Sequence, residues 1–172
     1  IPNKFQNKNN QNSKQKFILN LIDTPGHADF TYEVSRALAA VEGAILLVDA
    51  TQGVQAQTLA NLHLAKQENL VIIPVINKID LPFAEIEKVE EELATLLLVS
   101  RENIVRVSAK EGTGVRDLLH IIIDKVPFPH FDETNTHSKN GDTLRALVFD
   151  SQYDPYQGVV AHIRIFEGSV KP

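Results

Sequence analysis

The chain has 172 residues and a formal net charge of −5, with 43% hydrophobic and 23% charged residues. This composition is typical of a globular protein that can bury one core and part of a second. The absence of cysteine excludes disulfides, thiol catalysis and cysteine-ligated zinc. The negative charge offers RNA no attraction over the whole surface, and no apolar run is long enough to span a bilayer.

The first sixteen residues differ in composition from the rest. Residues 3–16 are rich in Asn, Gln and Lys, and Phe5 is their only apolar residue. Such a segment buries too little apolar surface to fold, so we predict a low-complexity loop over 1–16. An RNA-binding arm is the alternative interpretation of its lysines.

Residues 17–22 read as a strand that leads into a loop whose residue types could bind a ligand. That loop contains Asp23, Thr24, Pro25, Gly26 and His27. A carboxylate at a strand tip, followed by a Pro-Gly turn, suits a loop that meets a nucleotide γ-phosphate and its Mg²⁺. We expect Asp23 to hold the metal through water and the Gly26 N–H to approach a phosphate oxygen. An ordinary strand–turn–helix connection is the alternative.

Beyond this loop, helical and strand patterns alternate. Apolar residues recur with helical spacing over 30–41, 56–62, 86–97 and 115–123. Short apolar strands are predicted over 44–48, 71–76 and 104–107. Continuous apolar strands between helices indicate an α/β fold with a doubly wound, mostly parallel sheet. Ligands of such sheets bind at the carboxyl ends of the strands.

The strand over 71–76 ends at Asn77, Lys78 and Asp80 in an Asn-Lys-x-Asp motif. The Asp80 carboxylate has two acceptor oxygens, which match the adjacent N1–H and N2–H₂ donors of guanine. Asn77 can bond the base and tie neighbouring loops together, and the Lys78 stem can lie along the purine face. The motif therefore predicts a guanine site.

The strand over 104–107 ends at a second nucleotide-binding candidate, Ser108, Ala109 and Lys110. A small residue at 109 lets its backbone N–H reach the guanine O6, where adenine carries an amino group. Ser-Ala-Lys alone is a weak signal, but it stands at a third strand end in the same chain.

The alternation stops near residue 129. Residues 130–142 are polar and read as a linker that separates a nucleotide-binding region over 17–129 from 143–172. Residues 144–149 form a predicted strand, and 159–166 alternate with period two. This pattern predicts the start of an antiparallel β-barrel domain.

These motifs resemble the LepA (elongation factor 4) family of translational GTPases. Histidine after Asp-Thr-Pro-Gly points to translation factors, and stretches over 32–40, 55–61, 144–151 and 153–156 are similar to LepA. The resemblance covers most of residues 17–172. It implies a partial G domain followed by the start of domain II.

The resemblance implies that the intact protein binds and hydrolyses GTP with Mg²⁺ on the ribosome, promoting translation fidelity or back-translocation. His27 corresponds to the residue that positions water when the large-subunit sarcin–ricin loop approaches. The implied partners are the ribosome and tRNA, with peripheral inner-membrane association and no DNA. The implied location is the bacterial cytoplasm or the matrix of a mitochondrion or plastid.

The sequence departs from this family in one respect, because no G-x-x-x-x-G-K-S/T phosphate loop is present. A switch I threonine before residue 23 is missing as well. We therefore expect an N-terminally truncated fragment that is inactive by itself. The alternatives are a non-catalytic interaction remnant and another translational GTPase such as elongation factor G.

Overall fold

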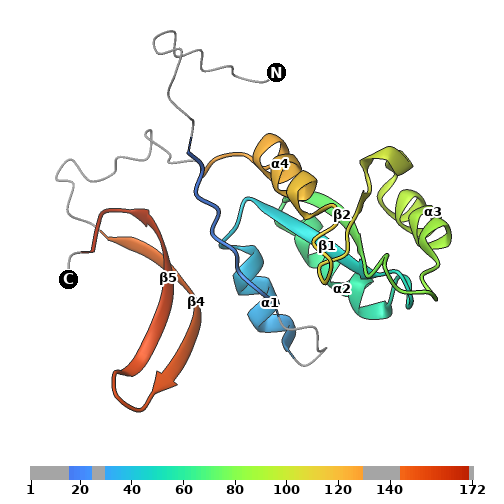
Figure 1. Ribbon diagram of the computed structural model, residues 1–172. Helices are drawn as coiled ribbons and strands as arrows, with labels where there is room; N and C mark the ends of the chain where they lie inside the picture. The colour runs from blue at the N-terminus through green and yellow to red at the C-terminus, as the bar shows by residue number, and fades with distance from the viewer. Residues whose placement is uncertain (1–15, 25–29, 130–143, 171–172) are drawn as a thin grey trace, which may run out of the picture.

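The computed structural model describes residues 16–24, 30–129 and 144–170, which form an α/β layered part and a β-hairpin (Figure 1). The layered part contains α1 (Thr31–Leu38), β1 (Gly43–Asp49), α2 (Ala56–Gln67), β2 (Val71–Asn77), α3 (Ile86–Leu97), the 3₁₀ turn η2 (Arg101–Asn103), β3 (Val105–Arg106) and α4 (Val115–Lys125). The hairpin contains β4 (Arg145–Asp154) and β5 (Gly158–Glu167).

The layered part is built on a parallel sheet in the order β1-β2-β3. β1 and β2 pair along their whole length, so that Asp49 lies beside Asn77 at their carboxyl ends. β3 is much shorter and pairs with β2 only through Val105 and Arg106. The polar residues that follow β1, β2 and β3 therefore meet at one edge of the sheet.

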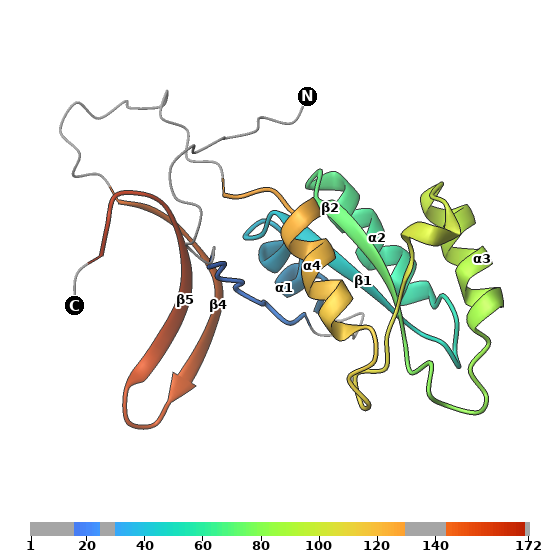
Figure 2. The same cartoon turned by 45° about the horizontal axis from the view of Figure 1, so that its top comes forward.

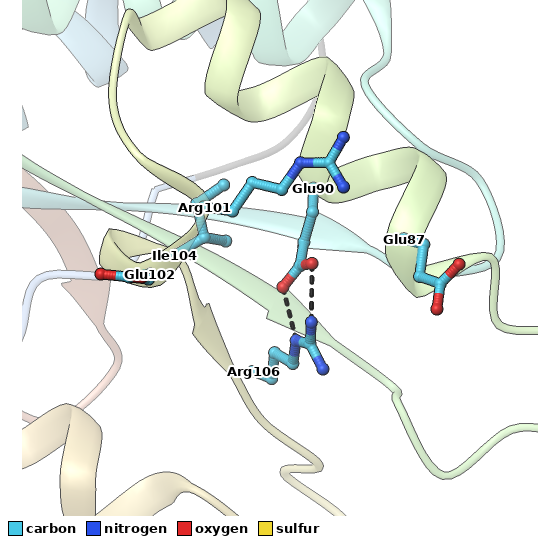
Figure 3. Close-up of a pocket in the computed structure, with 6 residues that line it drawn as sticks. All are labelled: Glu87, Glu90, Arg101, Glu102, Ile104 and Arg106. Carbon is cyan, nitrogen blue, oxygen red and sulfur yellow. Dashed lines mark hydrogen bonds and ion pairs between the residues drawn. The ribbon is translucent and has the colours of Figure 1, made fainter.

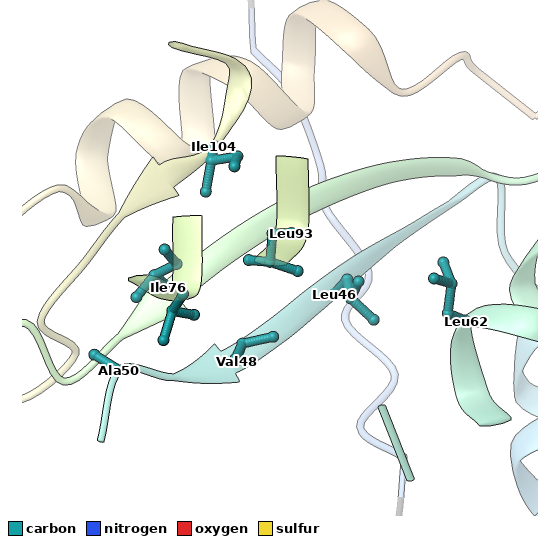
Figure 4. Close-up of a cluster of buried hydrophobic side chains, with 8 residues drawn as sticks. Leu46, Val48, Ala50, Leu62, Ile76, Leu93 and Ile104 are labelled. Carbon is teal, nitrogen blue, oxygen red and sulfur yellow. The ribbon is translucent and has the colours of Figure 1, made fainter. Parts of the chain in front are cut away.

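One face of the sheet is covered by α1, α2 and α3. Ile76 of β2 and Leu93 of α3 are fully buried there, next to Leu46 and Val48 of β1 (Figure 4). α1 adds a smaller cluster through Val34 and Leu38. The alternation of side chains along β2 sends Ile76 to this face and its neighbour Val75 to the other.

The opposite face of the sheet is covered by α4. Ile73 and Val75 of β2 and Val105 of β3 are buried against the apolar side of this helix. Helices on both faces of a parallel sheet confirm the predicted doubly wound α/β fold.

Two predicted strands differ in the structure. Residues 17–22 are extended but belong to no strand, and Phe17 stacks on Phe128 with ring centroids 6.4 Å apart. A strand needs a hydrogen-bonded neighbour, and within the described residues this segment joins neither sheet. The predicted strand over 104–107 is reduced to Val105–Arg106.

One predicted helix is shorter in the structure. Helix α1 ends at Leu38, so Val41, which belongs to the predicted helical stretch, lies outside the observed helix.

β4 and β5 form an antiparallel hairpin beside α1 (Figure 2). Among the contacts that join it to the layered part, Arg36 of α1 donates to the Val148 carbonyl, and Arg164 of β5 pairs with Glu42. The hairpin confirms the predicted antiparallel strands, while the barrel and the domain boundaries stay predictions.

Among the described helices, none has the length and apolar character that crossing a membrane requires.

Candidate functional site

The loop after β2 is fixed by the side chain of Asn77. Its Oδ1 accepts hydrogen bonds from the Lys78 N–H at 2.8 Å and from the Ala109 N–H at 3.0 Å. Lys78 has a φ of 65°, an uncommon conformation for a residue with a side chain. Both bonds use the amide oxygen of Asn77, so Nδ2 is the atom that is left to donate to a base.

Asp80 is fixed by the loop that follows β3. The Ser108 hydroxyl donates to Asp80 Oδ1 at 2.6 Å, and Ser108 is 1% exposed. This hydrogen bond, helped by the Asp80 N–H and by the charge of Lys110, lowers the pKa of Asp80. The carboxylate is exposed and anionic at neutral pH. Since each carboxylate oxygen has two lone pairs, both can still accept hydrogen bonds from a ligand.

The loop after β3 is closed by its own backbone. The Ser108 N–H donates to the Thr113 carbonyl at 3.0 Å, and the Glu111 N–H donates to Ser108 Oγ at 3.1 Å. Gly114 ends the loop with a φ of +73°, and a Cβ there would lie 2.1 Å from the Arg106 carbonyl oxygen. The loop therefore returns closely against the end of β3.

A third strand end joins the site through a residue that sequence reasoning missed. Asp49, at the end of β1, pairs with Lys78 Nζ at 2.6 Å and accepts from the Thr51 N–H and hydroxyl at 2.8 and 2.7 Å. The hydrogen bond from Lys78 is the main cause that lowers the pKa of Asp49. An acidic residue at the end of an apolar strand was the available signal.

The structure brings together five of the predicted nucleotide-binding residues. These are Asn77, Lys78, Asp80, Ser108 and Ala109. Lys110 is exposed next to them. The Ala109 N–H is bonded to Asn77, so a guanine O6 would have to share or replace that bond.

The other predicted residues lie on the segment that precedes α1. Asp23 is exposed and Thr24 is half-buried at the end of the extended stretch 16–24. The predicted Pro25, Gly26 and His27 lie outside the described residues. One exposed carboxylate fits the Mg²⁺ role expected of Asp23, because Mg²⁺ takes one or two carboxylates and fills its other positions with water and phosphate.

The comparisons with known proteins agree with this fold. The family of elongation factor Tu GTP-binding domains matches residues 4–128. The chain therefore belongs to this family, a class of GTP-binding domains of translation factors.

Within this class, the chain is similar to proteins named elongation factor 4. The protein of Rubrobacter xylanophilus is 58% identical over 155 residues, which are 90% of this chain and 24% of that protein. The protein of Clostridium tetani is 52% identical over 162 residues, or 94% and 26% of the two chains. These matches confirm the LepA resemblance, and the chain spans about a quarter of the length of these relatives.

A solved structure is similar as well. Translation elongation factor SelB from Methanococcus maripaludis, in complex with the GTP analogue GppNHp, matches with a TM-score of 0.65 at 26% identity. The match covers 85% of this chain and 32% of that protein.

Proposed function

We propose that this chain carries the guanine-recognition half of a GTP-hydrolysing, ribosome-associated translation factor. The observation that supports this most directly is the hydrogen-bonded pair of loops around Asp80 and Ser108. Asp80 offers an anionic carboxylate to the N1–H and N2–H₂ edge of guanine, and adenine has no such pair of donors. Asn77 holds the second loop at a fixed distance from the first.

The triphosphate contacts are proposed to come from residues of the whole protein outside these 172. The edge strand β1 supports this. Ile45 is 37% exposed and Leu47 is 55% exposed. Both lie on the sheet face that α4 covers at β2 and β3. An apolar strand edge of this kind suits a further strand and helix.

The proposed hydrolysis uses the loop over 23–27. Asp23 would hold Mg²⁺ through water, and the ion would neutralise charge on the phosphates when bound. His27 would orient the attacking water when the large-subunit sarcin–ricin loop approaches. An imidazole can donate and accept, and its ordinary pKa of about 6.5 places both forms near neutral pH.

The proposed partners and location are those that the family resemblance implies. Ribosome and tRNA contact and peripheral inner-membrane association belong to the whole protein. The named relatives are bacterial, which supports a bacterial cytoplasm over the matrix of a mitochondrion or plastid.

The base site is tested in the full-length protein with Asp80→Asn. Wild type is expected to bind GDP and to leave ADP unbound, while the variant is expected to prefer XDP. The reason is that the new amide can donate to the 2-carbonyl of xanthine. Calorimetric titration with GDP, XDP and ADP measures the preference. A variant that keeps its preference for GDP would show that Asp80 does not read the base.

The hydrolytic role is tested with His27→Ala. GDP affinity is expected to stay at the wild-type value, because His27 is assigned to the water and not to the base. Ribosome-stimulated GTP turnover is expected to fall by about 10²–10⁴-fold, the usual contribution of a positioned acid–base group. Phosphate release with and without ribosomes measures this, and an unchanged stimulated rate would remove His27 from the mechanism.

A further inference from the structure

An ion pair outside the candidate base site joins α3 to β3. Glu90, in the middle of α3, is 3% exposed. Arg106 of β3 donates to it twice, from Nε to Oε1 and from Nη2 to Oε2 at 2.7 Å (Figure 3). Such a two-pronged guanidinium–carboxylate pair restricts direction as well as distance.

The location of Arg106 lets this pair influence the position of the loop that contains Ser108. Arg106 is the last residue of β3, two positions before Ser108. β3 is held to β2 by only two residue pairs, so its ladder restrains it weakly. Next to it, the Val107 N–H donates to the Ile76 carbonyl at 2.8 Å, and the Ile79 N–H donates to the Val107 carbonyl at 3.4 Å.

The main chain of Arg106 also touches the far end of the same loop. Gly114 packs so closely on the Arg106 carbonyl that a Cβ would overlap it. The loop that holds Ser108 therefore begins and ends against Arg106. A shift of Arg106 would move Ser108, whose hydroxyl bonds Asp80.

Burial in the core does not explain why the Arg106 guanidinium is held in place. The Arg106 side chain is 52% exposed, in contrast to 4% for Glu90. Arg106 borders an open hollow between α3 and the η2–β3 segment, where Arg101, Glu102 and Ile104 lie beside it. The two hydrogen bonds to Glu90, and not enclosure by the core, hold the guanidinium in place.

We propose that Glu90 and Arg106 form a positioning pair, which sets the placement of Ser108 and Asp80 against the guanine base. This inference rests on the proposed guanine site. Neither residue touches the base. The pair acts by fixing the end of β3, from which the Ser108 loop departs.

The test compares Arg106→Met with Arg101→Met in the full-length protein. Arg101 borders the same hollow and pairs with Glu91 at 3.4 Å, but it does not lie on β3. The readouts are the GDP release rate and the ratio of GDP to IDP affinity. IDP lacks the 2-amino group, so this ratio reports how well Asp80 meets the base and does not depend on the folded fraction.

Arg106→Met is expected to release GDP about tenfold faster, the effect of losing one charged hydrogen bond, and to lower the GDP-to-IDP ratio several-fold. Arg101→Met is expected to match wild type in both. Wild-type values of both readouts in Arg106→Met would overturn the proposal.

The double variant Glu90→Leu/Arg106→Met separates positioning from stability. An apolar pair of similar volume often restores the stability that a lone buried charge removes. The double variant is therefore expected to regain the melting temperature of wild type but not its GDP-to-IDP ratio. If Arg106→Met does not fold, the ratio is measured in the double variant instead. Recovery of both would show a packing role only. A wild-type protein without GDP selectivity would overturn the base site itself.

Discussion

At the scale of single residues, Ser108 connects the two loops of the candidate base site. It is buried, donates to Asp80 and accepts from the Glu111 N–H. Its hydrogen bond stabilises the ionised form of Asp80, which explains the lowered pKa of this carboxyl group. Asp80 can therefore stay anionic in acid that would protonate an ordinary aspartate.

Ser108→Ala is expected to move the pKa of Asp80 upward. A depressed pKa means that the Ser108 contact with the carboxylate is complete above the unfolded pKa of about 3.9 and is lost as pH falls through the lower folded value. Without the hydroxyl, Asp80 therefore becomes protonated at a higher pH than in wild type. As the solution is acidified, GDP binding to the variant is expected to weaken at a higher pH than GDP binding to wild type. A ¹³C titration of the Asp80 carboxyl group measures the change.

Thr51→Ala is the matched control for this titration. Thr51 also donates a hydroxyl hydrogen bond to an aspartate of the site, but that aspartate is Asp49. The Asp80 titration is expected to stay unchanged in this variant. A shift of equal size in both variants would mean that the Ser108 hydrogen bond does not set the pKa of Asp80.

At the scale of elements, the short strand β3 depends on the turn that returns to it. Gly112 and Gly114 both have positive φ, at +77° and +73°. They differ in their surroundings, because a Cβ at Gly112 meets nothing within 4 Å while one at Gly114 meets the Arg106 carbonyl. The two glycines therefore separate backbone strain from steric overlap.

Gly112→Ala is expected to cost about 1 kcal/mol of unfolding free energy, the penalty of left-handed backbone. Gly114→Ala adds an overlap with main chain, which raises the loss by about 1–3 kcal/mol. Only Gly114→Ala is expected to weaken GDP binding as well, since it displaces the end of β3. Urea unfolding and GDP titration of the two variants measure this. Equal losses would contradict the close approach at Gly114.

At the scale of the whole molecule, the hairpin and the layered part meet at α1, where Arg36 donates to the Val148 carbonyl, and at Glu42, which follows α1 in the chain. The Glu42–Arg164 pair is largely shielded from water, with side chains 24% and 19% exposed. α1 follows the loop that contains the proposed Mg²⁺ ligand and His27. The hairpin therefore rests on the helix that is nearest in sequence to the proposed hydrolytic residues.

Glu42→Gln is expected to loosen this contact. The Arg164 guanidinium loses its anionic partner, and amides of β4 should exchange about fivefold faster, equivalent to about 1 kcal/mol. Glu167→Gln is the control, because its partner Arg145 lies within the hairpin and both side chains are more exposed. Hydrogen exchange measures both, and equal exchange in Glu42→Gln and wild type would show that the pair does not hold the hairpin.

The sequence by itself determined the alternation of helices and strands and pointed to the two loops of the candidate base site. Asn77, Asp80 and Ser108 could be found because each stands just beyond an apolar strand, and parallel strands end at a common edge. Helix α3 was predicted with its observed bounds because its apolar residues recur with helical spacing.

Only the tertiary structure decided which side chains meet across elements. Glu90 and Arg106 are sixteen positions apart, and Lys78 meets Asp49 from another strand. No local spacing encodes such pairs, since they depend on how α3, β1 and β2 pack. The same reason explains the error at residues 17–22. An apolar pattern indicates that a segment can form a strand, but a hydrogen-bonded neighbour decides whether it does.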